Sequence, residues 1–190
     1  MSHFAAAETS LPEHPFWQFS CQLYQERSVK QACLGLQNQL GMNVNVVLFA
    51  CWLAVSGRGR LQAADFTRIK RVIGHWHQSI TAKLRHFRQQ MSQQVAANDD
   101  FNLVNAVQQD ELVAEHIEQL LLAQGMSRTV MHERTGLQKV NDAIGSLQTY
   151  AKYLDVILRP AERQWCADIL QAVFNRMPEA QVKQMCGVVD

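Results

Sequence analysis

The feature that most constrains this 190-residue sequence is a run of ten apolar residues, from Val46 to Val55, within the segment NVNVVLFACWLAVSG. In a helix, ten residues extend for about 15 Å, whereas the hydrocarbon core of a bilayer is about 30 Å thick. Asn43 can cap the start of such a helix, and Gly57 can end it. The run therefore predicts a short helix that is apolar on all sides and is surrounded by other helices.

The rest of the chain also predicts an all-α protein. Glycine and proline are scarce, with 9 and 4 residues, and strand-type alternation never persists beyond a few residues. Apolar residues instead recur every three or four positions, which predicts helices over residues 13–26, 28–40, 43–57, 63–93, 104–124, 135–158 and 160–177. We expect a bundle of about seven helices, with a core of about five and a C-terminal helical hairpin.

The spacing divides the chain into four expected segments. They are a flexible N-terminus over residues 1–12, a helical core domain over 13–126, a C-terminal hairpin on or beside the core over 127–178, and a frayed tail over 179–190. The N-terminus lacks the basic and apolar regions of a signal peptide. The five cysteines lack metal-ligand spacing and favour buried free thiols. We therefore expect a cytoplasmic protein without a membrane span.

Three helices carry apolar positions whose direction can be predicted. In helix 63–93 we expect an inward stripe of Phe66, Ile69, Ile73, Trp76, Ile80, Leu84, Phe87 and Met91. In helix 104–124 the expected inward residues are Leu112, Val113, Ile117, Leu120 and Leu121. Residues 137–158 contain a strict heptad stripe, typical of a coiled-coil seam. The favoured interpretation is a hairpin with the next helix, and the alternative is a homodimer seam or a docking site for a partner helix.

Charge is distributed unevenly, although the formal net charge is only +1. Residues 58–88 contain eight basic residues and one acid, whereas residues 89–127 contain six acids and no Lys or Arg. A basic side of helix 63–93 is formed by Arg68, Arg71, His75, Arg85 and Arg88. Such a face can bind an acidic protein, our favoured partner, or RNA or the ribosome. It can instead be neutralised internally by Glu111, Glu115 and Glu118, or simply be solvated, and we favour these explanations.

A pocket is the second candidate site. Trp17, Tyr24, Asn45 and Trp52 would meet if helices 13–26 and 43–57 pack together. An amide among aromatic rings can orient a small ligand. A buried amide must also find hydrogen-bond partners, so Asn45 can equally cap or bridge a neighbouring helix. We favour this second role.

Local motifs predict no catalytic residue, metal or cofactor. His75 and His77 flank Trp76, but side chains two positions apart point away from each other on a helix. The sequence contains no HxxxH or HExxH pair, no GxGxxG and no P-loop. Enzymatic activity stays open, and a non-enzymatic role is favoured.

The N-terminal half resembles an uncharacterised family of small proteobacterial proteins. The matching segments are FWQFS, LY, ACLGLQ, GMNVN and LFACWLA, within residues 16–54. The family signature is similar: FWxFS…LY…ACLxLQ…GxxVNxxLFxxWLA. The later segment EHIEQL, residues 115–120, also resembles the family, so that the likeness covers roughly residues 14–124. The resemblance implies a helical, cytoplasmic bacterial protein and implies no reaction.

Two hypotheses of function follow. The leading one is a non-enzymatic cytoplasmic accessory protein that binds a macromolecular partner through the basic face of the long helix or through the C-terminal hairpin. The alternative is a small-molecule-binding protein or enzyme with a pocket near Asn45, Trp17 and Trp52.

Overall fold

The computed structural model describes residues 11–94, 103–130 and 134–188. Within these ranges all regular secondary structure is helical, which confirms the expected all-α bundle. The helices are α1 (Pro15–Leu23), α2 (Arg27–Leu40), α3 (Val44–Val55), α4 (Ala63–Trp76), the π-helix η1 (His77–Thr81), α5 (Ala82–Gln94), α6 (Leu103–Gly125), α7 (Gly136–Tyr153), α8 (Pro160–Val173) and α9 (Glu179–Met185).

Helix α3 is the centre of the core, as its apolar sequence predicts. All of its residues are buried except Trp52 and Val55. The Asn43 side chain caps it, because Oδ1 accepts a hydrogen bond from the Asn45 amide at 2.8 Å. Gly57 follows its end with φ of 74°, a left-handed conformation that suits glycine. In the part of the chain that the structure describes, α3 and the other helices all lack the length and apolar character needed to cross a bilayer.

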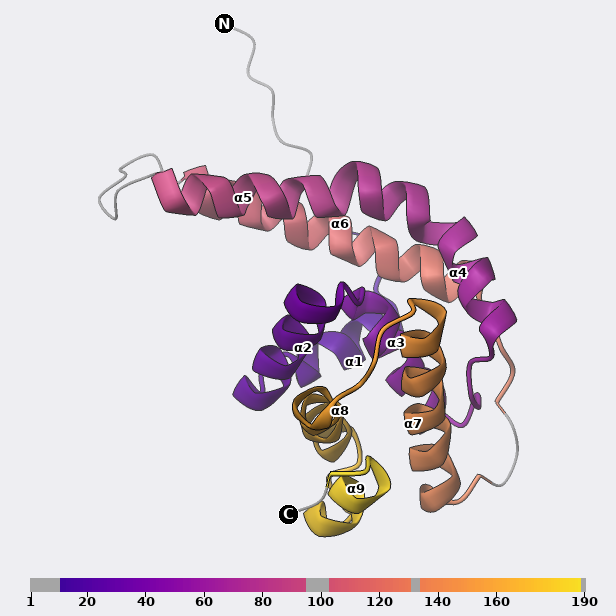
Figure 1. The fold of residues 1–190 in the computed structure, drawn as a ribbon. Helices are drawn as coiled ribbons and strands as arrows, with labels where there is room; N and C mark the ends of the chain where they lie inside the picture. The colour runs from indigo at the N-terminus through magenta and orange to yellow at the C-terminus, as the bar shows by residue number, and fades with distance from the viewer. Residues whose placement is uncertain (1–10, 95–102, 131–133, 189–190) are drawn as a thin grey trace, which may run out of the picture.

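Helices α4, η1 and α5 follow one another without a break and form one long rod (Figure 1). A π-turn contains one residue more than an α-turn, so it shifts the inward positions that follow it. Thr81 is consequently buried, whereas Ile80 and Phe87 of the expected stripe are 38% and 50% exposed. The predicted stripe is therefore wrong beyond Trp76 at these two positions.

The rod forms one layer of the molecule, and α6 lies beside it along most of its length (Figure 1). Helices α1, α2 and α3 lie next to this pair, and α7, α8 and α9 complete the opposite side. The α5–α6 end of the pair extends beyond the rest of the bundle, and we call it the arm. The arm therefore presents more surface to solvent than the core helices do.

The C-terminal helices α7 and α8 pack on the N-terminal helices. Helix α8 packs mainly on α2, where a Cβ atom at Gly35 would lie 2.7 Å from the Trp165 ring. Helix α7 packs mainly on α3, and its Tyr150 stacks on Phe66 of α4 at 5.0 Å between ring centroids. Helices α7 and α8 each contact these N-terminal helices more extensively than they contact each other.

The heptad stripe of residues 137–158 is used inside this core. Val140, Leu147 and Ala151 are almost completely buried, although Leu137 at its start is half exposed. The stripe therefore cannot form the homodimer seam considered from the sequence, because its central side chains are already covered.

The chain beyond Pro178 also differs from expectation. Residues 179–185 form α9, and Val182 and Cys186 are buried against the core. The expected fraying is therefore wrong for residues 179–188, because these two side chains hold the segment in place. Residues 189–190 and residues 1–10 of the expected flexible N-terminus lie outside the described residues.

Candidate functional site

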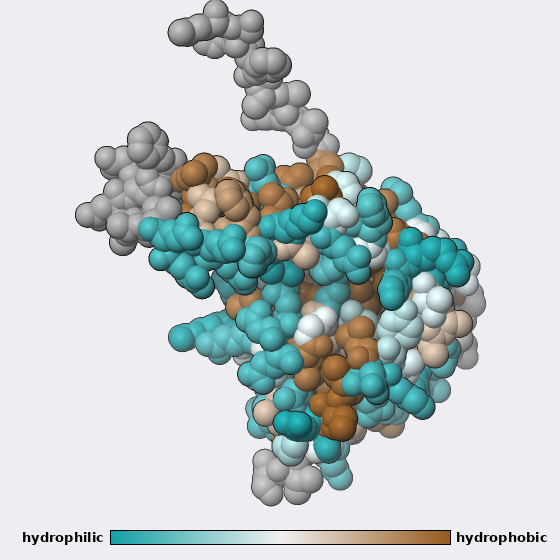
Figure 2. Space-filling model, turned by 45° about the horizontal axis from the view of Figure 1, so that its top comes forward, coloured by the Kyte–Doolittle hydropathy of each residue, from teal (hydrophilic) through white to brown (hydrophobic). Residues whose placement is uncertain are grey.

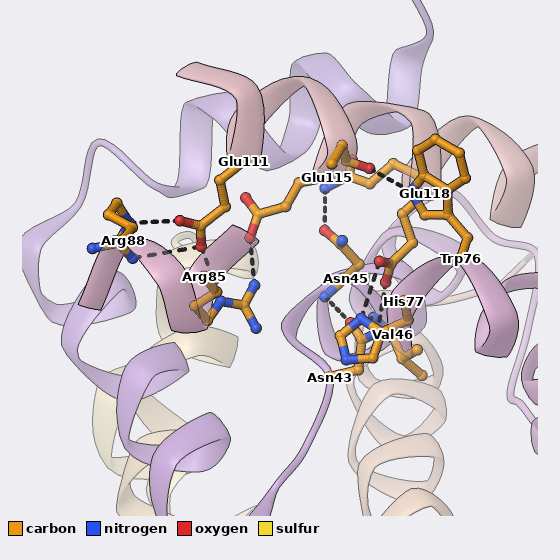
Figure 3. A network of polar contacts seen from close by, with 12 residues as sticks. Asn43, Asn45, Val46, Trp76, His77, Arg85, Arg88, Glu111, Glu115 and Glu118 are labelled. Carbon is orange, nitrogen blue, oxygen red and sulfur yellow. Dashed lines mark hydrogen bonds and ion pairs between the residues drawn. The ribbon is translucent and has the colours of Figure 1, made fainter. Parts of the chain in front are cut away.

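Helix α6 directs three carboxylates, Glu111, Glu115 and Glu118, toward the long rod (Figure 3). They lie four and three residues apart and so share one side of the helix. Each finds partners on the rod or on the turn before α3. The internal neutralisation considered from the sequence therefore occurs for Arg85 and Arg88, whereas Glu118 has other partners.

In the arm, the carboxylates pair with arginine. Arg85 donates from Nε to Glu111 Oε1 at 3.0 Å and from Nη2 to Glu115 Oε1 at 2.6 Å. Arg88 donates from Nε to Glu111 Oε2 at 2.5 Å. The guanidinium groups of Arg85 and Arg88 are therefore engaged within the molecule, and they are less available to a partner than their sequence positions suggested.

The other three residues of the basic face lie on α4. Arg68, Arg71 and His75 are exposed on its outer side. They take part in no ion pair among the described residues. The structure thus splits the expected basic face into a free α4 part and a paired α5 part.

Asn45 bridges two helices. Its side chain is buried, and Oδ1 accepts a hydrogen bond from Gln119 Nε2 of α6 at 2.8 Å. The bond joins the first turn of α3 to α6 across the core. Asn45 therefore has the bridging role that the sequence analysis favoured.

The aromatic residues expected beside Asn45 face separate neighbours. Trp17 stacks on His116 with ring centroids 4.1 Å apart. Trp52 packs against Phe16 at 5.5 Å. Tyr24 follows the end of α1, about 10 Å along the helix from Trp17 at 1.5 Å per residue. The structure therefore does not bring Trp17, Tyr24, Asn45 and Trp52 together around one cavity.

A polar cluster that the sequence analysis did not assemble joins Asn43, His77 and Glu118 (Figure 3). The Glu118 side chain is 0% exposed. Asn43 Nδ2 donates to Glu118 Oε1 at 2.6 Å, and His77 Nδ1 lies 3.0 Å from Glu118 Oε2. Because an ionised carboxylate can only accept hydrogen bonds, Nδ1 of His77 carries a proton and donates it to Glu118.

The electrostatics keep Glu118 ionised. Burial by itself raises the pKa of this carboxyl, but the hydrogen bond and electrostatic attraction from His77, together with the hydrogen bond from Asn43, outweigh it and lower the pKa below its usual value. Burying a carboxylate is costly, and among the described contacts Glu118 has no Arg or Lys partner to offset the cost. Such groups are concentrated at functional sites.

Two local features of the backbone position the residues of this cluster. Gly41, with φ of 64°, ends α2 and turns the chain so that Asn43 begins α3. The π-helix begins at His77 and ends at Thr81, so both residues lie near Glu118. Single π-turns within helices often occur at functional sites. The π-helix therefore lies beside the buried carboxylate of Glu118.

A cavity of about 590 Å³ opens beside the cluster, between the start of α3, α4 and α7. Asn43 and His77 form part of its wall, Lys70 is a cation on its edge, and Phe66 and Tyr150 supply a stacked aromatic surface. The Tyr150 hydroxyl accepts a hydrogen bond from the Asn43 amide at 3.1 Å, and burial raises its pKa to about 12. The volume lies within the roughly 300–1,000 Å³ of small-molecule sites.

The sequence contained only a faint signal for this site. Asn43 was recognised as a helix cap, and Glu118 as one of three acids. In α6 the inward side carries Val107, Glu111, Ala114, Glu118 and Leu122. Leu112 and Val113, expected inward, are 40% and 48% exposed. Assigning the register of α6 from the acids rather than from the apolar residues would have identified Glu118 as buried.

The described residues include no group of three or more His, Cys, Asp or Glu side chains arranged to hold a metal ion. The fold and the site thus define an all-helical protein with a ligand-sized cavity beside a buried His–carboxylate pair. The chain belongs to a family described as "Protein of unknown function (DUF2390)", whose model matches residues 15–122, more than half of the sequence. Asn43, His77 and Glu118 all fall inside the matched region. No curated protein and no solved structure matches the chain.

Proposed function

We propose that this protein binds a small molecule in the cavity between α3, α4 and α7, with His77 as the group that contacts its polar end. One observation carries the proposal: a fully buried Glu118, ionised by its partners, orients a histidine in the wall of a 590 Å³ cavity. The proposal moves the small-molecule site expected from the sequence away from Trp17 and Trp52, to the turn that precedes α3.

The walls of the cavity indicate the chemistry of the ligand. Phe66 and Tyr150 favour a planar apolar body, because aromatic rings prefer stacked or edge contacts with one another. Nε2 of His77 can accept a hydrogen bond from a hydroxyl or amine. A histidine oriented by a carboxylate is also the usual arrangement of a general base. Binding and proton abstraction from a bound hydroxyl are therefore both compatible with this geometry.

A fragment screen by thermal shift tests the proposal, with His77→Phe as the test variant and His86→Phe as the control. His86 is an exposed histidine of α5 outside the cavity. We expect some planar fragments to raise the Tm of the wild type and of His86→Phe, and to lose this effect in His77→Phe. A screen without stabilising fragments, or with equal shifts in all three proteins, would contradict the proposal.

A second candidate is supported by the free part of the basic face. Arg68, Arg71 and His75 lie exposed on α4. They suit a non-enzymatic cytoplasmic accessory protein whose partner is an acidic protein, or alternatively RNA or the ribosome. The C-terminal helices are less suited to docking, because their apolar stripe is buried.

A pull-down at low salt separates this candidate from the first. The test variant is Arg68→Glu with Arg71→Glu, and the control is Arg27→Glu with Lys30→Glu, which changes two exposed cations at the same spacing on α2. Loss of a captured acidic protein in the test variant alone would support the candidate. Equal capture by both variants would refute it, and capture of RNA instead would identify the alternative partner.

A further inference from the structure

A second cavity lies on the other side of α7, between α7, α8 and α9, with a volume of about 600 Å³. Its walls come from these helices and from the connection after α7, and they share no residue with the cavity beside His77. The residues that form it lie beyond the region matched by the family model. It is therefore independent of the proposed site.

Most of the uncharged side chains that line this second cavity are apolar, and Gln148 and Gln184 are the polar ones among them. Ile144, Leu147, Ala151 and Leu170 line it, together with the thiols of Cys166 and Cys186. Burial raises the pKa of these thiols to about 12 and about 11, so both are neutral at physiological pH. The apolar side chains and the neutral thiols therefore favour an occupant with an apolar body.

The charged groups of this cavity are Lys152, Asp155 and Arg163. Arg163 hydrogen-bonds two backbone carbonyls, that of Leu158 at 2.9 Å and that of Gly187 at 3.2 Å, and forms no ion pair with a carboxylate of the described residues. Lys152 is exposed and forms no ion pair among the residues that the structure describes. Two cations thus face one carboxylate, which leaves the mouth suited to an anionic head group.

The rim also has features of an incompletely filled site. Ile157 lines the cavity but is 75% exposed, and an apolar area bordered by polar side chains is visible in the lower half of Figure 2. Asp155 has φ of 56° and follows the end of α7 as a left-handed cap residue, where the Val156 amide donates to the Ala151 carbonyl at 3.0 Å. An apolar chain in the cavity would remove Ile157 from water.

We infer that this cavity binds a free fatty acid in its carboxylate form. The alkyl chain lies along α7, whose wall from Ile144 to Ala151 extends for about 10 Å at 1.5 Å per residue, and the carboxylate lies at Lys152. An amphipathic anion fits both the apolar side chains of the interior and the two cations of the described lining.

Titration calorimetry of the full chain with octanoate, dodecanoate and dodecanol tests the inference, at concentrations below micelle formation. We expect affinity to rise about fourfold for each methylene group that becomes buried. Dodecanoate should bind about tenfold more tightly than dodecanol, since only the carboxylate gains from Lys152.

Lys152→Glu should weaken dodecanoate binding about tenfold or more, because the head group then faces a negative charge. Lys139→Glu is the matched control, with the same charge change on α7 outside the cavity. Failure of both carboxylates to bind would overturn the inference. Equal binding of dodecanoate to the two variants would also overturn the inference. Equal affinity for dodecanoate and dodecanol would overturn it as well, because the cavity would then be a nonspecific apolar groove. Concentration-dependent self-association that dodecanoate does not reverse would identify a contact between copies instead.

Discussion

The carboxylates of α6 meet two different environments within a short stretch of one helix. Glu111 and Glu115 face Arg85 and Arg88 in the arm, where the guanidinium groups are 15% and 28% exposed. Glu118 faces Asn43 and His77 and is completely buried. The first arrangement pairs a buried carboxylate, Glu111, with two arginine side chains that are partly exposed. The second keeps an ionised group in the core with weaker partners than arginine.

This difference indicates which cluster serves the fold alone. Arginine and carboxylate neutralise each other, so the arm pairs stabilise the contact between α5 and α6 without any further partner. The Glu118 cluster does not neutralise its charge as fully, and an apolar residue would fill the same position at lower cost. The proposed role of Glu118, the orientation of His77 at a cavity, would account for this arrangement.

The largest effect should come from removing the buried carboxylate. Glu118→Ala leaves Asn43 and His77 without their acceptor and opens a hole in the core, so we expect the free energy of unfolding to fall by about 3–5 kcal/mol. Urea denaturation followed by circular dichroism measures this change. A loss below about 1 kcal/mol would mean that water replaces the carboxylate easily, and would remove the contrast with the arm.

Removing the arm carboxylate should cost less. Glu111→Ala leaves Arg85 and Arg88 without one acceptor, but both guanidinium groups can turn toward water. We therefore expect a loss of about 1–2 kcal/mol in the free energy of unfolding, measured in the same way. If Glu111→Ala and Glu118→Ala lost the same free energy of unfolding, the two carboxylates would contribute equally to stability. The proposed difference between the two clusters would then be contradicted.

The pH dependence of stability should show whether Glu118 is ionised in the folded protein. Its pKa in the folded protein is lowered from the usual 4.5, so its ionisation adds stability that is complete above the usual pKa and is lost as the pH falls toward the folded value. The stability advantage of the wild type over Glu118→Gln should therefore shrink as the pH falls from 7 to below 4.5. An advantage that stays constant or grows would show that Glu118 is protonated in the folded state.

We expect the smallest effect on stability from substitutions on the exposed side of α4. Arg68→Glu with Arg71→Glu should change the free energy of unfolding by less than about 0.5 kcal/mol, because neither side chain has a described ion pair. Arg85→Glu provides the contrast, since it places a third acid beside Glu111 and Glu115 and should cost clearly more. Equal losses in the two experiments would mean that the α4 face is paired after all.

Local signals predicted much of this fold. The ten-residue apolar run, the Asn43 cap and the Gly57 stop are local features, and each occurs where the sequence indicated. Helix α9 was missed because its hydrophobic content is small, although Val182 is completely buried. A single side chain that fits a distant surface gives no periodic signal.

The candidate site was harder to predict, because it depends on contacts between distant segments. The π-turn at His77 changes which residues face inward, and nothing in the local sequence marks the extra residue. The register of α6 was misjudged because Leu112 and Val113 are apolar yet exposed, whereas Glu118 is charged yet buried. Only the tertiary arrangement supplies the partners that make a buried carboxylate acceptable.

Nitrogen-15 NMR of histidine-labelled protein tests the central proposal most directly. The ring signals of His77 can be followed beside those of His75 and His86, which lie exposed on the same rod. When planar fragments that stabilise the protein are added, we expect the His77 ring signals to shift while those of His75 and His86 stay in place. Fragments that bind without moving the His77 signals would contradict the assignment of this cavity as the ligand site.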